Sequence, residues 1–409
     1  MAFTKLWVIA YRDLGRNRRR SGLTILAVTL GLAILILMSG YIAGIIDGSI
    51  SDSIRLNTGH VQVRVAGYEP ERASMQWQDL LENRAEILTS VSEIEGVEAV
   101  APVLWASGFL TTADETIGVR VTGINPDSGF HDPVRQGLVA GEFLAADDRE
   151  GVMIGKNLAD SLGISAGSKI SLLVGTSDGE TDEDTFTVRG VFHTGVLTYD
   201  EGTVYMPLPK AQAITGAGDR ISAVIVLTKD SETADPVAAV LRGQGHNVVT
   251  WQDMNALILV AIESGMSFYY LLYGIVILVV AVIIANTLLM SVFERTRELG
   301  ILAALGMKGR QIRTMILLEA GTLAVLGIIG GIALGSFFVW YLMVNGIPIG
   351  DEIAGMVQGF AMRNVLYTKF VPAEMVGLSL AMLVIVLLGA LYPASFAARL
   401  EPVEALHAL

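Results

Sequence analysis

Four long stretches of this 409-residue chain carry almost no charged side chains. Residues 21–46, 264–293 and 375–398 carry none, and residues 314–350 carry only Glu319. About 20 consecutive apolar residues span a bilayer as a helix, whereas a soluble helix is usually shorter and apolar on one face only. The sequence therefore predicts a membrane protein with four transmembrane α-helices, at 21–46, 265–293, 314–345 and 373–398.

Basic residues gather beside these helices at two places. Six Lys and Arg residues precede the first helix, against Asp13 alone, and five lie in the 294–313 loop, against Glu294 and Glu298. By the positive-inside rule both segments are cytoplasmic. The resulting topology predicts a multi-pass membrane protein with both termini cytoplasmic, a short outer loop at 346–372 and a cytoplasmic tail at 399–409.

The large segment at 47–264 then lies outside the cytoplasm. It holds 32 acidic and 14 basic residues, a net charge of −18, so it accounts for the acidity of the whole chain, whose net charge is −13. This acidity argues against a nucleic-acid partner, which would need a basic surface.

Residues 1–20 form a basic N-terminal segment. Phe3, Leu6, Trp7, Ala10 and Leu14 recur at helical spacing, which predicts an amphipathic helix lying in the cytoplasmic membrane surface. The alternative is a charge cluster that only orients the first helix.

The outer segment alternates between strand and helix patterns, which predicts a large extracytoplasmic α+β domain between the first and second membrane helices. It is expected to have two lobes, with residues of about 126–215 inserted into the other lobe. Helices are predicted at 77–94, 155–162 and 236–242, and strands at 60–65, 97–110, 117–124, 169–174, 185–192, 203–207, 221–227 and 248–251.

The sequence indicates no catalytic centre. G-x-S-x-G occurs around Ser165 and Ser177, but neither lies between a strand and a helix, as a nucleophile elbow requires. The chain has no Cys, and its five His residues are scattered, so no metal site is predicted. No P-loop string is present, so this chain is not expected to hydrolyse ATP itself, and no cofactor is expected in it.

The loop at 294–313 is unusually apolar for an exposed segment. Glu294 and Glu298 share a helix face, and Leu299, Ile301 and Leu305 would give a short helix an apolar surface for docking. We therefore expect a short helix in this loop that docks on a partner protein. Its predicted coupling residues are Glu294, Arg295, Arg297, Glu298, Gly300, Leu302 and Gly306.

The string ERTRELGILAALG at 294–306 resembles the signature of FtsX-like permeases, the four-helix class of ABC transporter membrane subunits that includes the MacB type. Residues 392–406 are similar to the ending of that class. Residues 186–200 and 250–257 resemble its lipoprotein-releasing branch.

The resemblance implies a complex of two permease chains, as a homodimer or a heterodimer, with two separate ATPase subunits. The MacB type carries a fused ATPase, which is not expected here. The resemblance also implies mechanotransmission, in which ATPase dimerisation moves the coupling helix and helix two carries the motion to the outer domain. The leading expectation is extraction of lipoproteins from the inner membrane to a periplasmic carrier. Two alternatives stay open: efflux of small molecules or peptides, and regulation of a cell-wall hydrolase.

A lipid entrance is expected near the outer ends of helix one and of helix two in the partner permease, because acyl chains need an apolar, adaptable wall. The predicted wall residues are Met38, Tyr41, Ile42, Ile45, Met266, Phe268, Tyr269 and Leu272.

Two ridges of small residues permit close helix packing. One is formed by Gly40, Gly44 and Gly48, and the other by Gly327, Gly331 and Gly335. Packing within one subunit and packing across a dimer both remain open. Glu319 is a candidate for a functional role or for an interfacial or capping role.

Overall fold

A computed structural model of the chain describes residues 18–349 and 363–399, except 71, 83 and 113–114. The predicted amphipathic helix lies almost entirely outside these residues, as do most of the C-terminal tail and the middle of the second outer loop. The chain divides into two compact units. The first comprises Met1–Ile46, Ile262–Ile347 and Tyr367–Leu409, and the second comprises Asp47–Ala261 and Pro348–Leu366.

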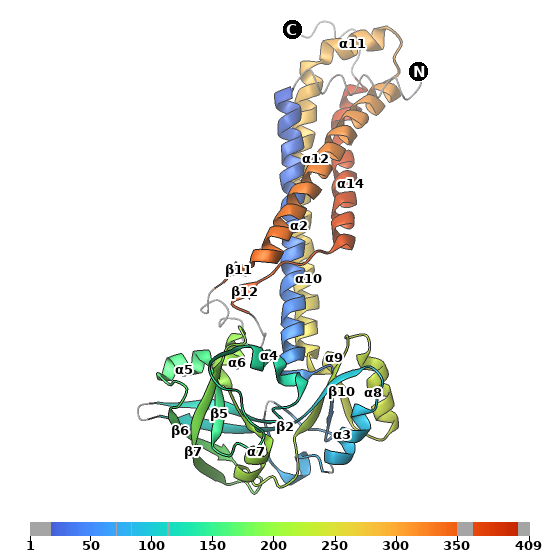
Figure 1. The fold of residues 1–409 in the computed structure, drawn as a ribbon. Coiled ribbons are helices and arrows are strands. Elements are labelled where there is room, and N and C mark those ends of the chain that lie inside the picture. Colours follow the sequence, from blue (N-terminus) through green and yellow to red (C-terminus); the bar gives the residue numbers. More distant parts are fainter. Residues whose placement is uncertain (1–17, 71, 83, 113–114, 350–362, 400–409) are drawn as a thin grey trace. The chain divides into compact units, whose positions relative to one another are not determined.

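The first unit is built from long helices that run side by side (Figure 1). They are α2 (Arg18–Ser53), α10 (Ala256–Glu294), α12 (Gly309–Asn345) and α14 (Pro372–Ala397). Among the described residues, these four helices are long and apolar enough to cross a membrane. The prediction of four transmembrane helices is therefore confirmed.

Three of the helices, α2, α10 and α12, are much longer than a bilayer requires, with 36, 39 and 37 residues. The 39 residues of α10 correspond to about 58 Å at 1.5 Å per residue, against a hydrocarbon core of about 30 Å. α10 begins at Ala256 and α2 continues to Ser53, so each extends beyond its predicted span on the side of the outer domain.

The helices share one apolar core. Leu32 and Leu35 of α2, Ile284 of α10, Ala324 of α12 and Met382 of α14 are all buried in it. Each helix thus presents one face to its neighbours and leaves the opposite face for lipid, which costs nothing in hydrocarbon because lipid tails are equally apolar.

The glycine ridge of α12 packs against α2 within the same chain. A Cβ atom added at Gly331 would lie 2.8 Å from Cβ of Leu32, and one added at Gly327 would lie 2.5 Å from Cβ of Val28. Any side chain at these positions would force the helices apart. The ridge therefore serves intrachain packing, one of the two alternatives left open by the sequence.

The second unit contains a mixed sheet. In the part of the chain that the structure describes, ten strands pair in the order β10-β1-β9-β2-β3-β8-β5-β7-β4, and β6 pairs with both β2 and β7. The strands are β1 (Val61–Arg64), β2 (Val97–Thr111), β3 (Thr116–Ile124), β4 (Leu138–Gly141), β5 (Gly151–Gly155), β6 (Lys169–Gly175), β7 (Thr181–Phe192), β8 (Thr203–Pro207), β9 (Ala223–Thr228) and β10 (Val248–Thr250). β3–β8 and β5–β7 are parallel.

The pairings β2–β3–β8–β5–β7–β6–β2 return to their starting strand, so these six strands close into a small barrel. β10, β1 and β9 continue the sheet from β2 as an open edge. Because β2 belongs to both parts, the second unit is compact as a whole. The division into two lobes, with residues 126–215 inserted, stays a prediction.

Short helices and turns cover the sheet and connect its strands. They are η1 (Ile54–Thr58), η2 (Trp77–Asp79), α3 (Arg84–Ser92), η3 (Gly129–His131), α4 (Asp132–Gln136), α5 (Lys156–Leu162), α6 (Leu197–Gly202), α7 (Leu208–Ile214), α8 (Ala234–Gly243) and α9 (Trp251–Met254). β11 (Ile347–Pro348) and β12 (Val365–Leu366) form a separate two-stranded sheet. The mixture of strands and helices confirms the predicted α+β class.

The predicted helix at 77–94 is wrong in its first half. A 3-10 turn at Trp77–Asp79 is followed by extended backbone at Leu80. Leu81 then forms a β-bridge with Ile221. This pairing with a residue far along the chain prevents the helix from starting before Arg84.

Candidate functional site

The short helix predicted in the 294–313 loop is present as α11 (Thr296–Ala304), and its docking role stays a prediction. It is separated from α10 by Arg295, whose φ of −111° and ψ of 14° are not helical. Gly306 ends it with a φ of 91°, a left-handed conformation that favours glycine. The Met307 N–H donates to the Leu302 carbonyl and the Gly306 N–H to the Ala303 carbonyl, the hydrogen bonds of a Schellman motif.

α11 has one face in the protein and one face exposed. Leu299 and Gly300 are buried, and Leu299 packs with Val292 of α10 and Met315 of α12. Leu299 therefore does not contribute to a docking surface, contrary to our expectation. Ile301 and Leu305 are 46% and 80% exposed, so these two residues form the apolar part of the free face.

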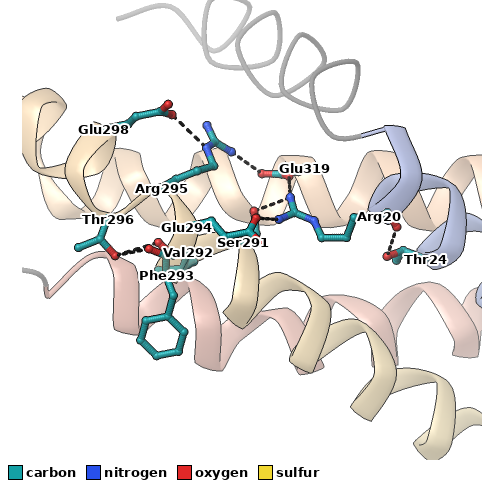
Figure 2. A network of polar contacts seen from close by, with 10 residues as sticks. All are labelled: Arg20, Thr24, Ser291, Val292, Phe293, Glu294, Arg295, Thr296, Glu298 and Glu319. Atoms are coloured by element: carbon teal, nitrogen blue, oxygen red, sulfur yellow. Dashed lines mark hydrogen bonds and ion pairs between the residues drawn. The ribbon is translucent and has the colours of Figure 1, made fainter. Parts of the chain in front are cut away.

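The buried face adjoins a network of charges (Figure 2). Arg20, in the first turn of α2, donates from Nη1 to Oε2 of Glu294 at 3.0 Å and from Nη2 to Oγ of Ser291 at 2.7 Å. The same Nη2 lies 3.8 Å from Oε1 of Glu319 in α12. Arg20 thus connects the start of α2 with the end of α10 and with α12.

Arg295 extends the network to the docking helix. Its Nη1 lies 3.4 Å from Oε2 of Glu319, and its Nε lies 3.4 Å from Oε2 of Glu298 in α11. The side chain of Glu319 is only 5% exposed and that of Arg295 only 12%. One buried carboxylate therefore lies between guanidinium groups from two different elements.

The structure shows what surrounds Glu319, whose role the sequence left open. Removing one partner of a buried ion pair leaves the other charge uncompensated, which is strongly destabilising. A displacement of α11 relative to α2 or α12 would incur such a cost at Glu319 or Arg295. The network can therefore hold α11 in one position relative to three long helices. The sequence analysis used Arg20 only as one of the basic residues that orient the first helix. It could not predict the ion pairs of Arg20, because their partners are distant along the chain.

The remaining predicted coupling residues lie around α11. Arg297 is exposed and Leu302 is half-buried. Glu298 is 40% exposed and Glu294 is 44% exposed, so each carboxylate bonds within the chain and still reaches the surface. The structure brings all seven predicted coupling residues onto α11 and its two ends.

The predicted lipid-entrance residues lie on α2 and α10. Met38, Ile42, Met266 and Tyr269 contribute to the shared helical core, where Ile42 is buried. Phe268, in contrast, is 60% exposed. The remaining residues, Tyr41, Ile45 and Leu272, are half-buried. α2 and α10 of the same chain therefore use part of the predicted wall for their own packing.

In the second unit, the segment at 186–200 supports the second outer loop. The buried Asp200 accepts hydrogen bonds from the N–H groups of Thr194 and Gly195, and its Oδ2 lies 2.8 Å from Nδ1 of His193. The Gly195 carbonyl in turn accepts from the N–H of Asn364. Burial raises the pKa of Asp200, and the hydrogen bonds from Thr194 and Gly195 offset only part of this effect.

A second contact holds the same loop. Nε of Arg363 donates to both carboxylate oxygens of Asp52, at 2.8 and 3.0 Å, and the side chain of Asp52 is 3% exposed. Asp52 and Arg363 lie far apart in the sequence, and no local pattern pointed to this ion pair.

His131 is a buried titratable group beside the barrel. It is 3% exposed, and its ring lies 6.3 Å from that of Tyr205 and 5.3 Å from that of Phe130. Among the described residues, its Nε2 has no hydrogen-bond partner. Burial, assisted by Arg135, lowers the pKa of His131 to about 3.

Comparison with known proteins agrees with this architecture. The family described as the MacB-like periplasmic core domain matches residues 21–244, and the FtsX-like permease C-terminal family matches residues 270–402. This chain is an FtsX-like permease with a MacB-like periplasmic core domain. The resemblance noted in its motifs is thereby confirmed, and the chain is an ABC transporter permease of the LolC/LolE or MacB type.

Relatives of this permease include the "Lipoprotein-releasing system transmembrane protein LolC" of Neisseria meningitidis, 22% identical over 96% of each chain. The "Macrolide export ATP-binding/permease protein MacB" of Rhodospirillum rubrum is 28% identical over all of this chain and 61% of its own. The solved periplasmic region of MacB from Actinobacillus actinomycetemcomitans matches 51% of this chain and 97% of its own, at 16% identity and a TM-score of 0.35.

Proposed function

We propose that this permease works by mechanotransmission and extracts lipoproteins from the outer leaflet of the inner membrane, for transfer to a periplasmic carrier. Two permease chains would combine with two separate ATPase subunits, which bind ATP and Mg²⁺. Both termini and α11 would lie in the cytoplasm, as the distribution of basic residues favours.

The observation that carries the mechanical part is the position of α11. Its free face exposes Ile301 and Leu305, while its other face is tied through Arg295 and Glu319 to α12 and through Glu319 to Arg20 of α2. A force on the free face would therefore reach several membrane helices at once. α2 and α10 are long enough to carry that force past the bilayer.

The lipoprotein cargo is supported by the LolC relatives, which align with this chain along nearly their whole length. A triacyl anchor explains the need for ATP. Each buried CH₂ group is worth about 0.8 kcal/mol, so three acyl chains require tens of kcal/mol to leave the bilayer unaided. The lipid must therefore pass between sheltered apolar sites.

The test is a release assay in proteoliposomes that contain the permease, the ATPase that co-purifies with it, a triacylated lipoprotein and a periplasmic carrier. We expect the lipoprotein to appear on the carrier only when ATP is hydrolysed. The permease alone should hydrolyse no ATP. ATP-dependent release of a small molecule, or activation of a cell-wall hydrolase without lipoprotein release, would contradict the cargo and favour an alternative.

A further inference from the structure

An apolar groove lies between α12 and α14, on the half of these helices nearest to α11. It has a volume of about 390 Å³, within the range of about 300–1,000 Å³ typical of small-molecule sites. Its walls are formed by Leu317 and Leu318 of α12 and by Val384, Leu387, Leu388 and Leu391 of α14.

The groove offers no polar group to a ligand. The hydroxyl of Thr314, which also borders it, donates to the carbonyl of Arg310 at 2.9 Å. Val384 and Leu388 are more than half exposed, so the groove opens to the surroundings of the helices. In a membrane, such a surface accepts an acyl chain.

Three arginines lie in the turns next to the end of the groove nearest to α11. Arg310 lies four residues before Thr314 and Arg313 four residues before Leu317, so both lie on the groove side of α12, one turn beyond its lining. Arg399 joins them, because a Cβ atom at Gly309 would lie 2.6 Å from the carbonyl oxygen of Ala398. All three side chains belong to exposed residues.

We propose that this groove binds an anionic phospholipid of the leaflet on the α11 side. The acyl chain lies along the leucines, and the phosphate and acidic headgroup lie between the arginines. Arginine suits this role because its planar guanidinium group binds phosphate oxygens in a bidentate manner. Basic pockets between transmembrane helices on the cytoplasmic side recognise anionic lipid headgroups in this manner.

The test uses the full chain in nanodiscs of equimolar phosphatidylglycerol and phosphatidylcholine, with retained lipids identified by native mass spectrometry. We expect phosphatidylglycerol to be retained at least about tenfold over phosphatidylcholine. The double variant R310Q/R313Q should lose this preference. R19Q should keep it, because Arg19 is an exposed arginine at the same end of the helices and lies in α2, outside the groove.

A second pair of variants tests the apolar part. L388W fills the groove and should remove retention of both lipids, whereas L380W, at a similarly exposed leucine of α14 outside the groove, should not. Equal retention of the two lipids by the wild type would overturn the proposal. So would an equal loss in R19Q, or efficient cross-linking through position 388 of two copies of the chain, since a second copy would then cover the groove.

Discussion

Glu319 is the residue whose environment constrains the molecule most. Its carboxylate is almost fully buried in a helix that crosses the membrane, and it faces guanidinium groups from the start of α2 and from the junction of α10 and α11. Ion pairs at a surface contribute little to stability. The contribution of the Glu319 ion pairs to stability depends on their burial, because the loss of either charge leaves the other buried without a partner.

We expect Glu319→Gln to lower the free energy of unfolding by about 2 kcal/mol, because the amide can still accept hydrogen bonds but no longer balances two arginines. Glu294→Gln serves as the matched control. The carboxylate of Glu294 is 44% exposed, so its loss should cost under about 1 kcal/mol. Thermal unfolding in detergent measures the stability of both variants. An equal loss of stability in the two would show that burial of Glu319 is unimportant.

His131 should make the outer domain sensitive to acid. Its pKa is about 3 in the folded chain, against about 6.5 when unfolded, so below pH 6.5 the unfolded state takes up a proton that the folded state excludes. Its contribution to stability is complete above pH 6.5 and is lost as the pH falls towards 3. Between pH 7 and pH 5 the loss amounts to about 2 kcal/mol.

Hydrogen exchange of the amides of β3 and β8 in the full chain provides the measurement. Their protection should fall between pH 7 and pH 5, after correction for the intrinsic exchange rate. His131→Phe keeps an aromatic ring in the apolar site and removes the titration, so it should abolish most of this change. A variant with an unaltered pH dependence would assign the effect to another group.

At the scale of elements, two leucines in and beside α11 differ in exposure, and we therefore expect different effects when each is replaced. Leu299 is 3% exposed and Leu305 is 80% exposed. Leu299→Ala should destabilise the chain by about 2–5 kcal/mol, as for other buried leucines. Leu305→Ala should leave stability unchanged and weaken the association with the ATPase.

Thermal unfolding and quantitative co-purification with the ATPase distinguish the two variants. If Leu305→Ala binds the ATPase normally, the exposed face of α11 is not the docking surface. The same assays apply to Glu298→Lys and Gly300→Leu, which we expect to uncouple ATP hydrolysis from transport. Gly300 is buried, so part of its effect should appear as lost stability.

The contact between α12 and α2 depends on the absence of a side chain. Gly331→Val would place its Cβ atom 2.8 Å from Cβ of Leu32, and such overpacking typically costs about 1–3 kcal/mol. Gly274→Ala on α10 is the control, because a Cβ there meets no atom within 4 Å. Unfolding by denaturant in mixed micelles should show a loss for the first variant and none for the second.

At the scale of the whole molecule, the proposed lipid entrance would lie where side chains of α2 and α10 remain uncovered. Photo-crosslinkers at Phe268 and Tyr41 should form adducts with a lipoprotein in cells. Ile42, buried in the core of its own chain, should form none, and neither should Leu380 on α14. Equal labelling at all four positions, or labelling of bulk phospholipid alone, would exclude an entrance formed by α2 and α10.

The sequence alone determined the four membrane-spanning helices and the short helix α11. Both are local properties. A run of more than 20 residues without charge is stable as a helix in lipid whatever its neighbours are, and the short helix before Gly306 is ended by a Schellman motif within a few residues. Strands with a polar face, such as β6 (Lys169–Gly175), were predictable for the same reason.

Only the tertiary structure decided which surfaces meet. β5 was missed because it begins and ends with glycine and no alternation marks it as a strand, whereas the equally buried β8 contains the strand formers Val204 and Tyr205 and was predicted. Three examples join residues that lie in different helices. They are the burial of Leu299, the packing of Gly331 against Leu32 and the pairing of Arg20 with Glu319. Such contacts depend on the simultaneous packing of several helices, which no periodicity within one segment encodes.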